Sequence, residues 1–411
     1  MGFKFIHMAD VHLDTPFAGK EKTLRSKFIS WTTNAFSNAV DFAICKKVNA
    51  VLIAGDLFDS GTFSFASEIF MMEQMKRLDD AGVDVFYAPG NHDPYTQIAK
   101  LNWPQNVTIF NSEEPVTVEV EDKLGNILTR ITGAGHKTSS VSENLVQKFE
   151  PCTDSKVPHI GLIHTMVAGS GGAEHGRYAP SRLDNLMEKN YTYWALGHIH
   201  KREILSDMPY ALYPGNLIGR NPKESGQKGI VLVEINDDKK VDLKFIPISP
   251  IVWLNVNIEG LDNIERLEEL LSFLKEQISG KIVSYSESML LRVNLKGPAL
   301  LYSDLKDEEN INALEDELLA LANIEYLEID NSQINQPVIP AHFRGQPHIL
   351  GAALNILEKL YEDDELLLKL KPEKLAGLLN IGDDQVIGYL RSLLNNMEYD
   401  LIAKLLKEAK H

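Results

Sequence analysis

Seven side chains in the N-terminal part of the sequence are of the types that hold divalent cations in proteins: carboxylates, imidazoles and a side-chain amide. Each lies at the end of a short apolar run or just after one. They are Asp10, His12, Asp56, Asn91, His164, His198 and His200. Hydrolysis of a phosphodiester bond needs an activated water, neutralised phosphate oxygens and a proton for the leaving group, and two cations about 4 Å apart supply the first two. The set therefore predicts a two-metal hydrolytic site.

The predicted ligands divide into two metal sites that share one bridging carboxylate. Asp56 is the candidate for the bridge because it follows the apolar run Val-Leu-Ile-Ala through a single glycine. A strand that ends in Gly-Asp delivers its carboxylate to the carboxyl edge of a sheet, where α/β folds place their chemistry. Metal site A would be completed by Asp10, His12 and His200, and metal site B by Asn91, His164 and His198.

The proton for the leaving group is assigned to His92. This histidine is adjacent to Asn91 and is not needed as a ligand, so it is placed to protonate the leaving oxygen. Asp59 follows Asp56 by three positions. Its carboxylate could accept a hydrogen bond from the other ring nitrogen of His92 and keep the imidazole protonated. We therefore predict catalytic roles for His92 and Asp59.

Each of these motifs is weak evidence when taken alone, because Asp-X-His and Gly-Asp pairs are common. The joint pattern is stronger, since five motifs occur in order at predicted strand exits and together supply the ligands of two metals. His7 lies inside the first predicted strand and is interpreted as a core histidine. The glycine-rich loop 166–180 could place Arg177 or Tyr178 on a substrate phosphate or base, and a solvated loop is an equally good interpretation.

The elements that must position these residues alternate between strands and helices. Strands are predicted at 3–9, 50–54 and 83–88, and amphipathic helices at 28–48 and 65–81. Such alternation with short connections indicates a mostly parallel sheet with helices on its faces. From about residue 105 shorter strands dominate, apart from a helix at 181–190. We therefore expect two sheets packed face to face, with every ligand at a strand exit.

The pattern changes near residue 250. Residues 251–335 alternate as a small α+β domain without clustered ligands, and a Pro-rich linker at 335–340 leads to the helical region 336–411. In that region, apolar residues three or four apart between Val386 and Leu406 predict one continuous stripe. The stripe could pack on its own domain, which is the favoured interpretation, or dock on a partner helix. The predicted domains are 1–250, 251–335 and 336–411.

Composition places the chain among soluble globular proteins, with 44% hydrophobic and 24% charged residues. Its 58 acidic and 41 basic residues give a net charge of −17, and most of the acidic excess lies after residue 250. This charge argues against a broad, sequence-independent grip on long DNA, but not against a phosphodiester at a metal site. No apolar run is long enough for a membrane span. Cys45 and Cys152 have no paired spacing, which favours a reducing, cytoplasmic location.

The order of motifs D-X-H, G-D-X-X-D, G-N-H-D, H and G-H-X-H resembles that of the calcineurin-like metallophosphoesterase superfamily, and it covers all signature blocks of that superfamily within residues 1–250. Two longer segments, H-M-A-D-V-H-L-D-T-P-F-A-G and Y-P-G-N-L-I-G-R followed by G-Q-K-G-I-V-L-V-E-I, look like the DNA-repair exonuclease branch. Within that branch of SbcD-type nucleases, the sequence resembles the YhaO-like group.

The resemblance implies an α/β fold, a four-layer α-β-β-α sandwich followed by a small capping domain and a helical C-terminal region. It also implies a 3′-to-5′ nuclease with two divalent metal ions, Mn²⁺ in relatives, although Fe²⁺ and Zn²⁺ suit the same ligands. DNA, single-stranded or at duplex ends, would be the substrate, and an SMC-like coiled-coil ATPase the partner. In the family, the positions that match the seven ligands bind metal and the position of His92 is catalytic. Asn216 replaces a serine that is common in relatives and is predicted near the substrate path.

Three functions remain open from the sequence. The first is a DNA nuclease in repair, with exonuclease and endonuclease activity both open. The second is a phosphodiesterase for small nucleotides, and the third is a metal-binding scaffold without catalysis. Scaffolds of this kind usually lack a ligand or the acid, and neither is missing here. Relatives also dimerise through helices of the catalytic domain; helix 28–48 or helix 65–81 could do so, or could simply cover a face of the sheet.

Overall fold

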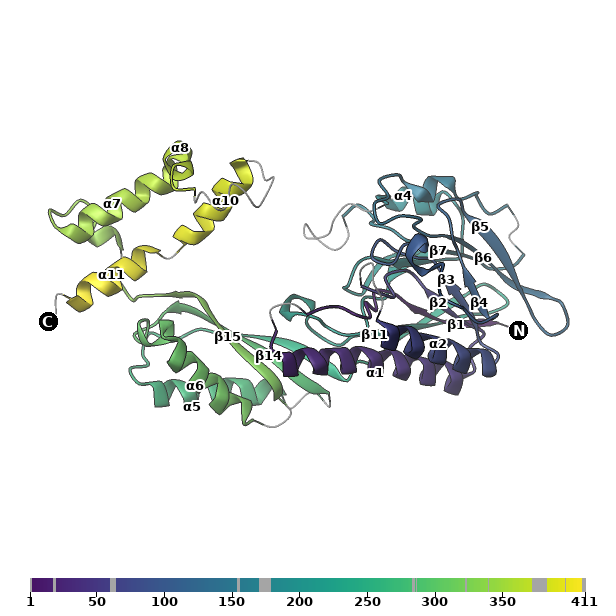
Figure 1. The fold of residues 1–411 in the computed structure, drawn as a ribbon, viewed down its shortest axis with the longest axis horizontal. Coiled ribbons are helices and arrows are strands. Elements are labelled where there is room, and N and C mark those ends of the chain that lie inside the picture. Colours follow the sequence, from purple (N-terminus) through teal and green to yellow (C-terminus); the bar gives the residue numbers. More distant parts are fainter. Residues whose placement is uncertain are drawn as a thin grey trace. The chain divides into compact units, whose positions relative to one another are not determined.

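The computed structural model describes residues 2–17, 20–59, 64–153, 156–169, 179–282, 285, 287–321, 324–338, 340–371, 383–395 and 397–408. The chain forms two compact units (Figure 1). The N-terminal unit contains residues 1–254 and 286–290, and the C-terminal unit contains residues 255–285 and 291–411. The strands β13 and β14 run from one unit into the other, so the boundary near residue 254 falls inside a strand. The division into three domains stays a prediction.

The first sheet of the N-terminal unit has the strand order β12-β11-β1-β2-β3-β4. Its central strands β1 to β4 are parallel, and β11 and β12 are antiparallel additions at one edge. The strands are β1 (Phe3–Met8), β2 (Ala50–Ile53), β3 (Asp84–Tyr87), β4 (Val107–Ile109), β11 (Gly229–Ile235) and β12 (Val241–Pro247). The helices between them are α1 (Lys22–Lys46), α2 (Phe65–Asp80) and α3 (Tyr95–Ile98).

The second sheet has the order β5-β6-β7-β8-β10-β9, with β6, β7, β8 and β10 parallel. Its strands are β5 (Val116–Glu121), β6 (Ile127–Ala134), β7 (His159–His164), β8 (Tyr193–Gly197), β9 (Glu203–Asp207) and β10 (Tyr210–Tyr213). Short helical segments accompany it: η1 (Leu145–Lys148), α4 (Leu183–Met187) and η2 (Pro222–Glu224).

The core lies in layers. Phe5 and Leu52 of the first sheet and Ile131 and Leu162 of the second are fully buried in one cluster between the sheets. The outer face of the first sheet is covered by α1 and α2, which contact β11 and β3 (Figure 1). A second cluster around Trp194 covers the outer face of the second sheet under η1 and α4. The predicted four-layer sandwich is therefore confirmed.

Helix boundaries differ from the sequence prediction where a local signal was misread. Helix α1 begins at Lys22, six residues before the predicted start, because Leu24 adds a buried apolar residue one turn before Phe28. It ends at Lys46 because Lys47 adopts the left-handed conformation, with φ 50°, that terminates helices. The predicted helix 181–190 is only the five-residue α4.

The C-terminal unit begins with a three-stranded sheet in the order β13-β14-β15. The elements of this α+β part are β13 (Ile251–Ile258), α5 (Leu267–Ile282), β14 (Ser288–Pro298), η3 (Asp304–Lys306), α6 (Glu308–Leu319) and β15 (Ile324–Asn335). The helical part that follows contains η4 (Pro340–His342), α7 (Ile349–Glu362), α8 (Asp364–Leu368), α10 (Asp383–Leu394) and α11 (Met397–Glu408). None of the described helices is long and apolar enough to cross a membrane.

The predicted continuous apolar stripe at the C-terminus is wrong. The stripe is divided between α10 and α11, and each helix packs on a different neighbour. Val386 and Leu390 of α10 join Leu367 of α8 in one cluster, whereas Ile402 of α11 joins Leu354 of α7 in another. The buried residues of the stripe therefore serve the packing of their own unit, which was the favoured interpretation.

Candidate metal centre

The predicted ligands occupy the carboxyl ends of five strands. Asp10 and His12 follow β1, Asp56 follows β2, Asn91 follows β3, His164 ends β7, and His198 and His200 follow β8. Strands β1, β2 and β3 are parallel neighbours in one sheet, and β7 and β8 are parallel neighbours in the other. Parallel strands end at the same edge, so the two stacked sheets bring all seven residues together. Each of them except the partly exposed His200 is buried.

The backbone at this edge is strained. Asp10, His12, Asp56 and His198 have φ values of 53°, 52°, 52° and 112°, in the left-handed region that non-glycine residues rarely adopt. Such conformations cost on the order of 1–3 kcal/mol each and persist only where the surrounding structure holds them. Four predicted ligands share this feature, which is typical of a functional site.

Metal site A brings together a carboxylate and two imidazoles. His12 Nε2 lies 3.1 Å from His200 Nε2 and 3.8 Å from Asp56 Oδ2. Asp10, His12 and His200 each offer a ligand atom within 4.8 Å of the others. The main-chain N–H of His198 donates to both carboxylate oxygens of Asp10 at 3.2 Å, which holds that carboxylate in place.

Metal site B is arranged around His164. Its Nε2 lies 3.3 Å from Asp56 Oδ2, 3.0 Å from Asn91 Oδ1 and 3.3 Å from His198 Nδ1. Its Nδ1 donates to the carbonyl oxygen of Ala54 at 2.9 Å, so Nε2 presents a lone pair to the Asp56 carboxylate. Two lone pairs this close need positive charge between them, which a proton or a cation supplies.

The electrostatics of the centre agree with a cation-binding role. Burial alone would lower the pKa of His164, but the Asp56 carboxylate outweighs it and raises this pKa to about 9. The pKa of Asp56 is held well below its usual range, because the surrounding imidazoles outweigh the opposing effect of burial. Asp56 is therefore an ionised carboxylate whose oxygens face both metal sites. The residues present fit two divalent cations with nitrogen and oxygen ligands.

The predicted acid lies beside this centre and faces solvent. The side chain of His92 is 41% exposed, and its Nδ1 lies 2.7 Å from Asp59 Oδ1. Its main-chain N–H donates to Asp56 Oδ1 at 2.9 Å. The hydrogen bond to Asp59 raises the pKa of His92 above its ordinary value. The hydrogen bond therefore favours the protonated imidazole, which is accessible next to the predicted bridge.

Two residues that the sequence reasoning did not single out support His200. Glu224 Oε1 accepts from His200 Nδ1 at 2.8 Å, and the backbone N–H of Arg220 donates to Glu224 Oε2 at 2.7 Å. A carboxylate on the outer nitrogen of a metal-binding imidazole fixes its tautomer and orientation. The only sequence signal was that Arg220 belongs to the Y-P-G-N-L-I-G-R segment.

A further overlooked residue, Asp93, organises the loop that carries Asp56. Its buried carboxylate accepts from the backbone N–H groups of Gly90 at 2.8 Å, and of Asp56 and Phe58 at 3.1 Å. It also accepts from Leu57 N–H and the Tyr87 hydroxyl. Burial, with a smaller contribution from Asp56, raises the pKa of Asp93 to about 7. Its place in the G-N-H-D motif was visible in the sequence, but this role was not.

The remaining predicted residues lie elsewhere. His7 is fully buried between the sheets, with Nδ1 2.9 Å from the Tyr193 hydroxyl, so its interpretation as a core histidine is confirmed. Asn216 is 1% exposed, and its amide donates to Glu224 Oε2 at 2.7 Å; its contact with substrate stays a prediction. Arg177 and Tyr178 lie outside the described residues.

Comparison with known proteins gives the family. The sequence profile described as calcineurin-like phosphoesterase matches residues 3–202. The uncharacterized metallophosphoesterase YhaO of Bacillus subtilis is 32% identical over 300 residues, which are 72% of this chain and 72% of that protein.

More distant relatives include two kinds of nuclease or repair protein. The DNA double-strand break repair protein Mre11 of Sulfurisphaera tokodaii is 27% identical over 49% of this chain and 50% of that protein. A component of the nuclease SbcCD of Escherichia coli K12 is 22% identical over 75% of this chain and 92% of that protein. With its groups of candidate ligands for divalent metal ions, the chain belongs to the calcineurin-like phosphoesterases.

Proposed function

We propose that this protein is a metal-dependent DNA nuclease, a 3′-to-5′ exonuclease that hydrolyses phosphodiester bonds in DNA repair. The observation that supports the proposal is the complete arrangement: six predicted ligand side chains gather around the Asp56 carboxylate, the predicted bridge, and the solvent-exposed His92 lies beside it. The names of the distant relatives, a repair protein and a nuclease component, support DNA as the substrate.

In this proposal the protein residues have separate tasks. When bound, two divalent cations would supply an activated water and neutralise the phosphate oxygens. Asp10, His12 and His200 would hold one cation, Asn91, His164 and His198 would hold the other, and Asp56 would serve both. His92 keeps its Nδ1 proton on Asp59 and donates the Nε2 proton to the leaving oxygen. The nitrogen and oxygen ligands suit Mn²⁺, the ion that we propose, as well as Fe²⁺ and Zn²⁺.

The proposal is tested with linear duplex and single-stranded DNA in the presence of Mn²⁺. We expect the wild-type protein to shorten DNA from 3′ ends and the Asp56→Asn and His92→Ala variants to lose this activity. The exposed His342 offers a matched control, since His342→Ala removes a histidine from the other unit. Hydrolysis of a small nucleotide diester without any DNA cleavage would favour a small-nucleotide phosphodiesterase. Full DNA cleavage by Asp56→Asn would rule out the two-metal assignment.

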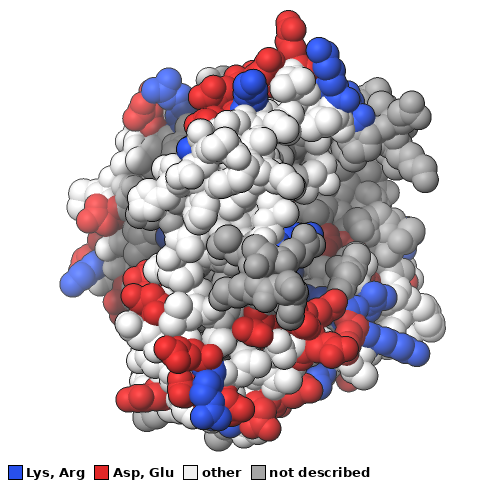
Figure 2. All heavy atoms as spheres, turned by 90° about the vertical axis from the view of Figure 1, so that its left-hand side faces the viewer, with Lys and Arg blue, Asp and Glu red and all other residues white. Residues whose placement is uncertain are grey.

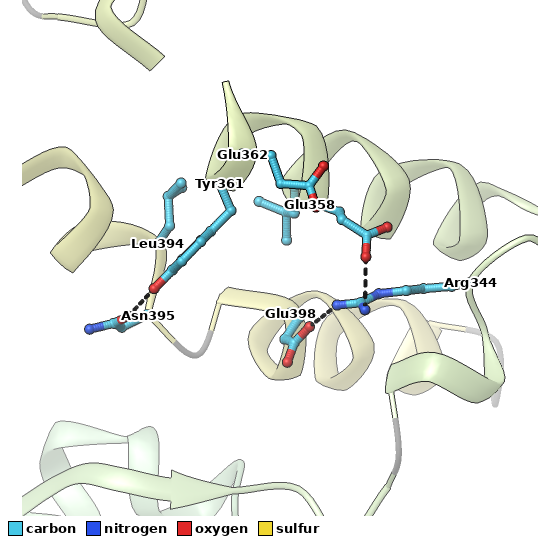
Figure 3. A pocket seen from close by; sticks show the side chains of 8 residues that line it. Arg344, Glu358, Tyr361, Glu362, Leu394, Asn395 and Glu398 are labelled. Carbon is cyan, nitrogen blue, oxygen red and sulfur yellow. Dashed lines mark hydrogen bonds and ion pairs between the residues drawn. The ribbon is translucent and has the colours of Figure 1, made fainter. Parts of the chain in front are cut away.

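We also propose that residues 336–411 dock a partner protein, an SMC-like coiled-coil ATPase. A pocket of about 440 Å³ lies between α7 and the ends of α10 and α11. In Figure 3, Arg344 lies between Glu358 and Glu398, at 3.1 Å and 2.8 Å from their carboxylate oxygens. Apolar side chains and further acid complete the lining, which consists of Arg344, Leu357, Glu358, Tyr361, Glu362, Leu394, Asn395 and Glu398.

A partner helix that carries both apolar and basic residues would complement this lining, because the lining combines apolar side chains with acidic ones. Acidic side chains also gather in the lower part of the face in Figure 2. Such a surface disfavours the binding of nucleic acid.

We expect a coiled-coil ATPase to co-purify with the full chain and to be lost on deletion of 336–411. Glu362→Lys should weaken the association and Glu308→Lys, on the exposed start of α6, should not. Retained binding by the truncated chain would refute the docking site.

A second copy of the chain is proposed to cover α2. Phe65 and Ile69 are 75% and 52% exposed and lie one turn apart on this helix. A charge at this position should prevent association, so we expect Phe65→Glu to sediment as a monomer where the wild type sediments as a dimer. Leu124→Glu is the control, because Leu124 is 86% exposed in a turn of the second sheet. A wild-type protein that sediments as a monomer at all protein concentrations would refute the proposal.

A further inference from the structure

Arg220 lies between the two carboxylates that hold functional imidazoles. Its Nη1 is 3.6 Å from Asp59 Oδ2, and its Nη2 is 3.7 Å from Glu224 Oε1. Asp59 holds the predicted acid His92, and Glu224 holds the predicted ligand His200. The side chain of Arg220 is only 18% exposed, so it is part of the site rather than of the surrounding surface.

The guanidinium of Arg220 acts on these carboxylates through its charge. Both carboxylate oxygens lie beyond ordinary hydrogen-bond distance from it. Its Nη2 is 3.1 Å from His200 Nδ1, but that nitrogen donates to Glu224 and has no lone pair to offer. The buried Nε also has no hydrogen-bond partner among the described residues. A buried donor without an acceptor is costly and calls for a functional reason.

The position of Asp59 supplies that reason. Its Oδ1 faces two imidazoles, His92 at 2.7 Å and His12 at 3.6 Å, so the carboxylate could turn from one toward the other. Its Oδ2, on the other side, receives the Thr15 hydroxyl at 2.7 Å and faces Arg220. Attraction by the guanidinium keeps Oδ2 on that side and therefore keeps Oδ1 on His92.

Glu224 is held in a similar way. Its Oε2 accepts from the backbone N–H of Arg220 and from Asn216, both at 2.7 Å, while its Oε1 remains on His200. The Arg220 side chain then lies beside Oε1. One arginine therefore borders both the carboxylate that orients the acid and the carboxylate that orients a ligand of metal site A.

We propose that Arg220 is a positioning residue that couples the orientation of His92 to metal site A, by holding the Asp59 and Glu224 carboxylates as a pair. The kinetic part of this inference rests on the proposed phosphodiesterase chemistry, whereas the metal-binding part does not. Loss of the guanidinium should release Asp59 toward His12 and loosen Glu224 on His200. It should therefore slow turnover and weaken one of the two metal sites.

The test compares Arg220→Met, which removes the charge at similar length, with Arg220→Lys, which keeps a charge, and Arg220→Gln, which keeps donors without a charge. Arg266→Met is the control, because Arg266 is 67% exposed in the other unit. Mn²⁺ is titrated calorimetrically into metal-free protein, and kcat is measured with bis(p-nitrophenyl) phosphate. We expect Arg220→Met to raise the Kd of one Mn²⁺ site and to lower kcat, each by about 10-fold or more. Arg220→Lys should recover part of both losses.

Double variants separate coupling from general damage. In an Asp59→Asn background at saturating Mn²⁺, Arg220→Met should lower kcat no further, and in a Glu224→Gln background it should weaken Mn²⁺ binding no further. Independent, multiplicative losses in either background would overturn the inference, as would equal behaviour of Arg220→Met and Arg266→Met. If Arg220→Met does not fold, Arg220→Gln carries the same two readouts. If DNA is not cleaved by the wild type, the proposed function fails while the calorimetric result still decides on the coupling.

Discussion

Asp59 Oδ1 lies 2.7 Å from Nδ1 of His92 and 3.6 Å from Nδ1 of His12, so one carboxylate oxygen faces both the predicted acid and a predicted metal ligand. Despite partial burial, its hydrogen bonds with His12, His92 and Thr15 hold the pKa of Asp59 far below the usual range. The shorter contact is the one to His92. The geometry therefore assigns Asp59 first to the acid and only second to the metal site.

Asp59→Asn should slow turnover while leaving the metal content nearly unchanged. The amide oxygen can still face His92 but no longer stabilises its charge, and a positioned acid contributes about 10²- to 10⁴-fold to such rates. We expect kcat to fall within that range, with two metals per chain by elemental analysis. Asp184→Asn, on the exposed start of α4, is the control. A variant that loses a metal would show that the contact with His12 matters more.

Asp56→Ala should empty both metal sites, whereas His198→Ala should affect only metal site B. Asp56 Oδ2 lies 3.8 Å from His12 Nε2 and 3.3 Å from His164 Nε2, so it is shared by the two groups of ligands. The measurement is the number of Mn²⁺ ions bound per chain after dialysis against a defined free concentration. Two ions on Asp56→Ala would contradict the bridging position.

Asp93→Ala should destabilise the protein and reduce metal binding, although Asp93 is not a predicted ligand. The substitution leaves the N–H groups of Gly90, Asp56 and Phe58 without their buried acceptor, at about 1–3 kcal/mol for each unsatisfied group. We expect a lower Tm and a higher Kd for Mn²⁺. The exposed control is Asp184→Ala. An unchanged Kd at a lower Tm would mean that the loop keeps its conformation without Asp93.

Removal of divalent metal should lower the stability of the N-terminal unit. Asp10 and Asp56 are both buried at the candidate metal centre, and their like charges repel without cations between them. Binding to the folded state stabilises it by about 2.7 kcal/mol at a free concentration 100 times Kd. The Tm should fall in a chelator and recover with Mn²⁺, and the Asp56→Ala variant should show neither change. If the Tm of the wild-type protein did not change on addition of Mn²⁺, the predicted metal centre would be contradicted.

The packing of the C-terminal helices can be tested with two residues of the apolar stripe that the sequence predicted between Val386 and Leu406. Ile402 of α11 is fully buried, whereas Leu393 of α10 is 52% exposed. Ile402→Ala should therefore lower the free energy of unfolding by about 2–5 kcal/mol, and Leu393→Ala should change it little. Denaturant titration of both variants provides the measurement. Similar, small effects would mean that the helices do not form the observed clusters.

The sequence by itself was sufficient to predict the fold of the N-terminal unit and which side chains gather at its candidate metal centre. Both depend on local signals: apolar runs mark β1, β2 and β3, and a predicted ligand such as Asp56 follows each run within a few residues. Because parallel strands end at one edge, order along the chain already implies proximity in space. The contact between Asp59 and His92 could be predicted for the same reason, since both follow neighbouring strands.

Only the tertiary structure decided which residues support that centre. Glu224 and Arg220 are distant in sequence from Asp59 and His200, and their side chains meet only because β11 and its preceding loop return to the metal edge. The role of Asp93 depends on backbone N–H groups, which every residue carries and no sequence pattern marks. The apolar residues around Val386 and Ile402 showed helical spacing, but spacing does not determine whether one helix or two bury them. Contacts of this kind arise from long-range packing, whereas the motifs arise from the chain itself.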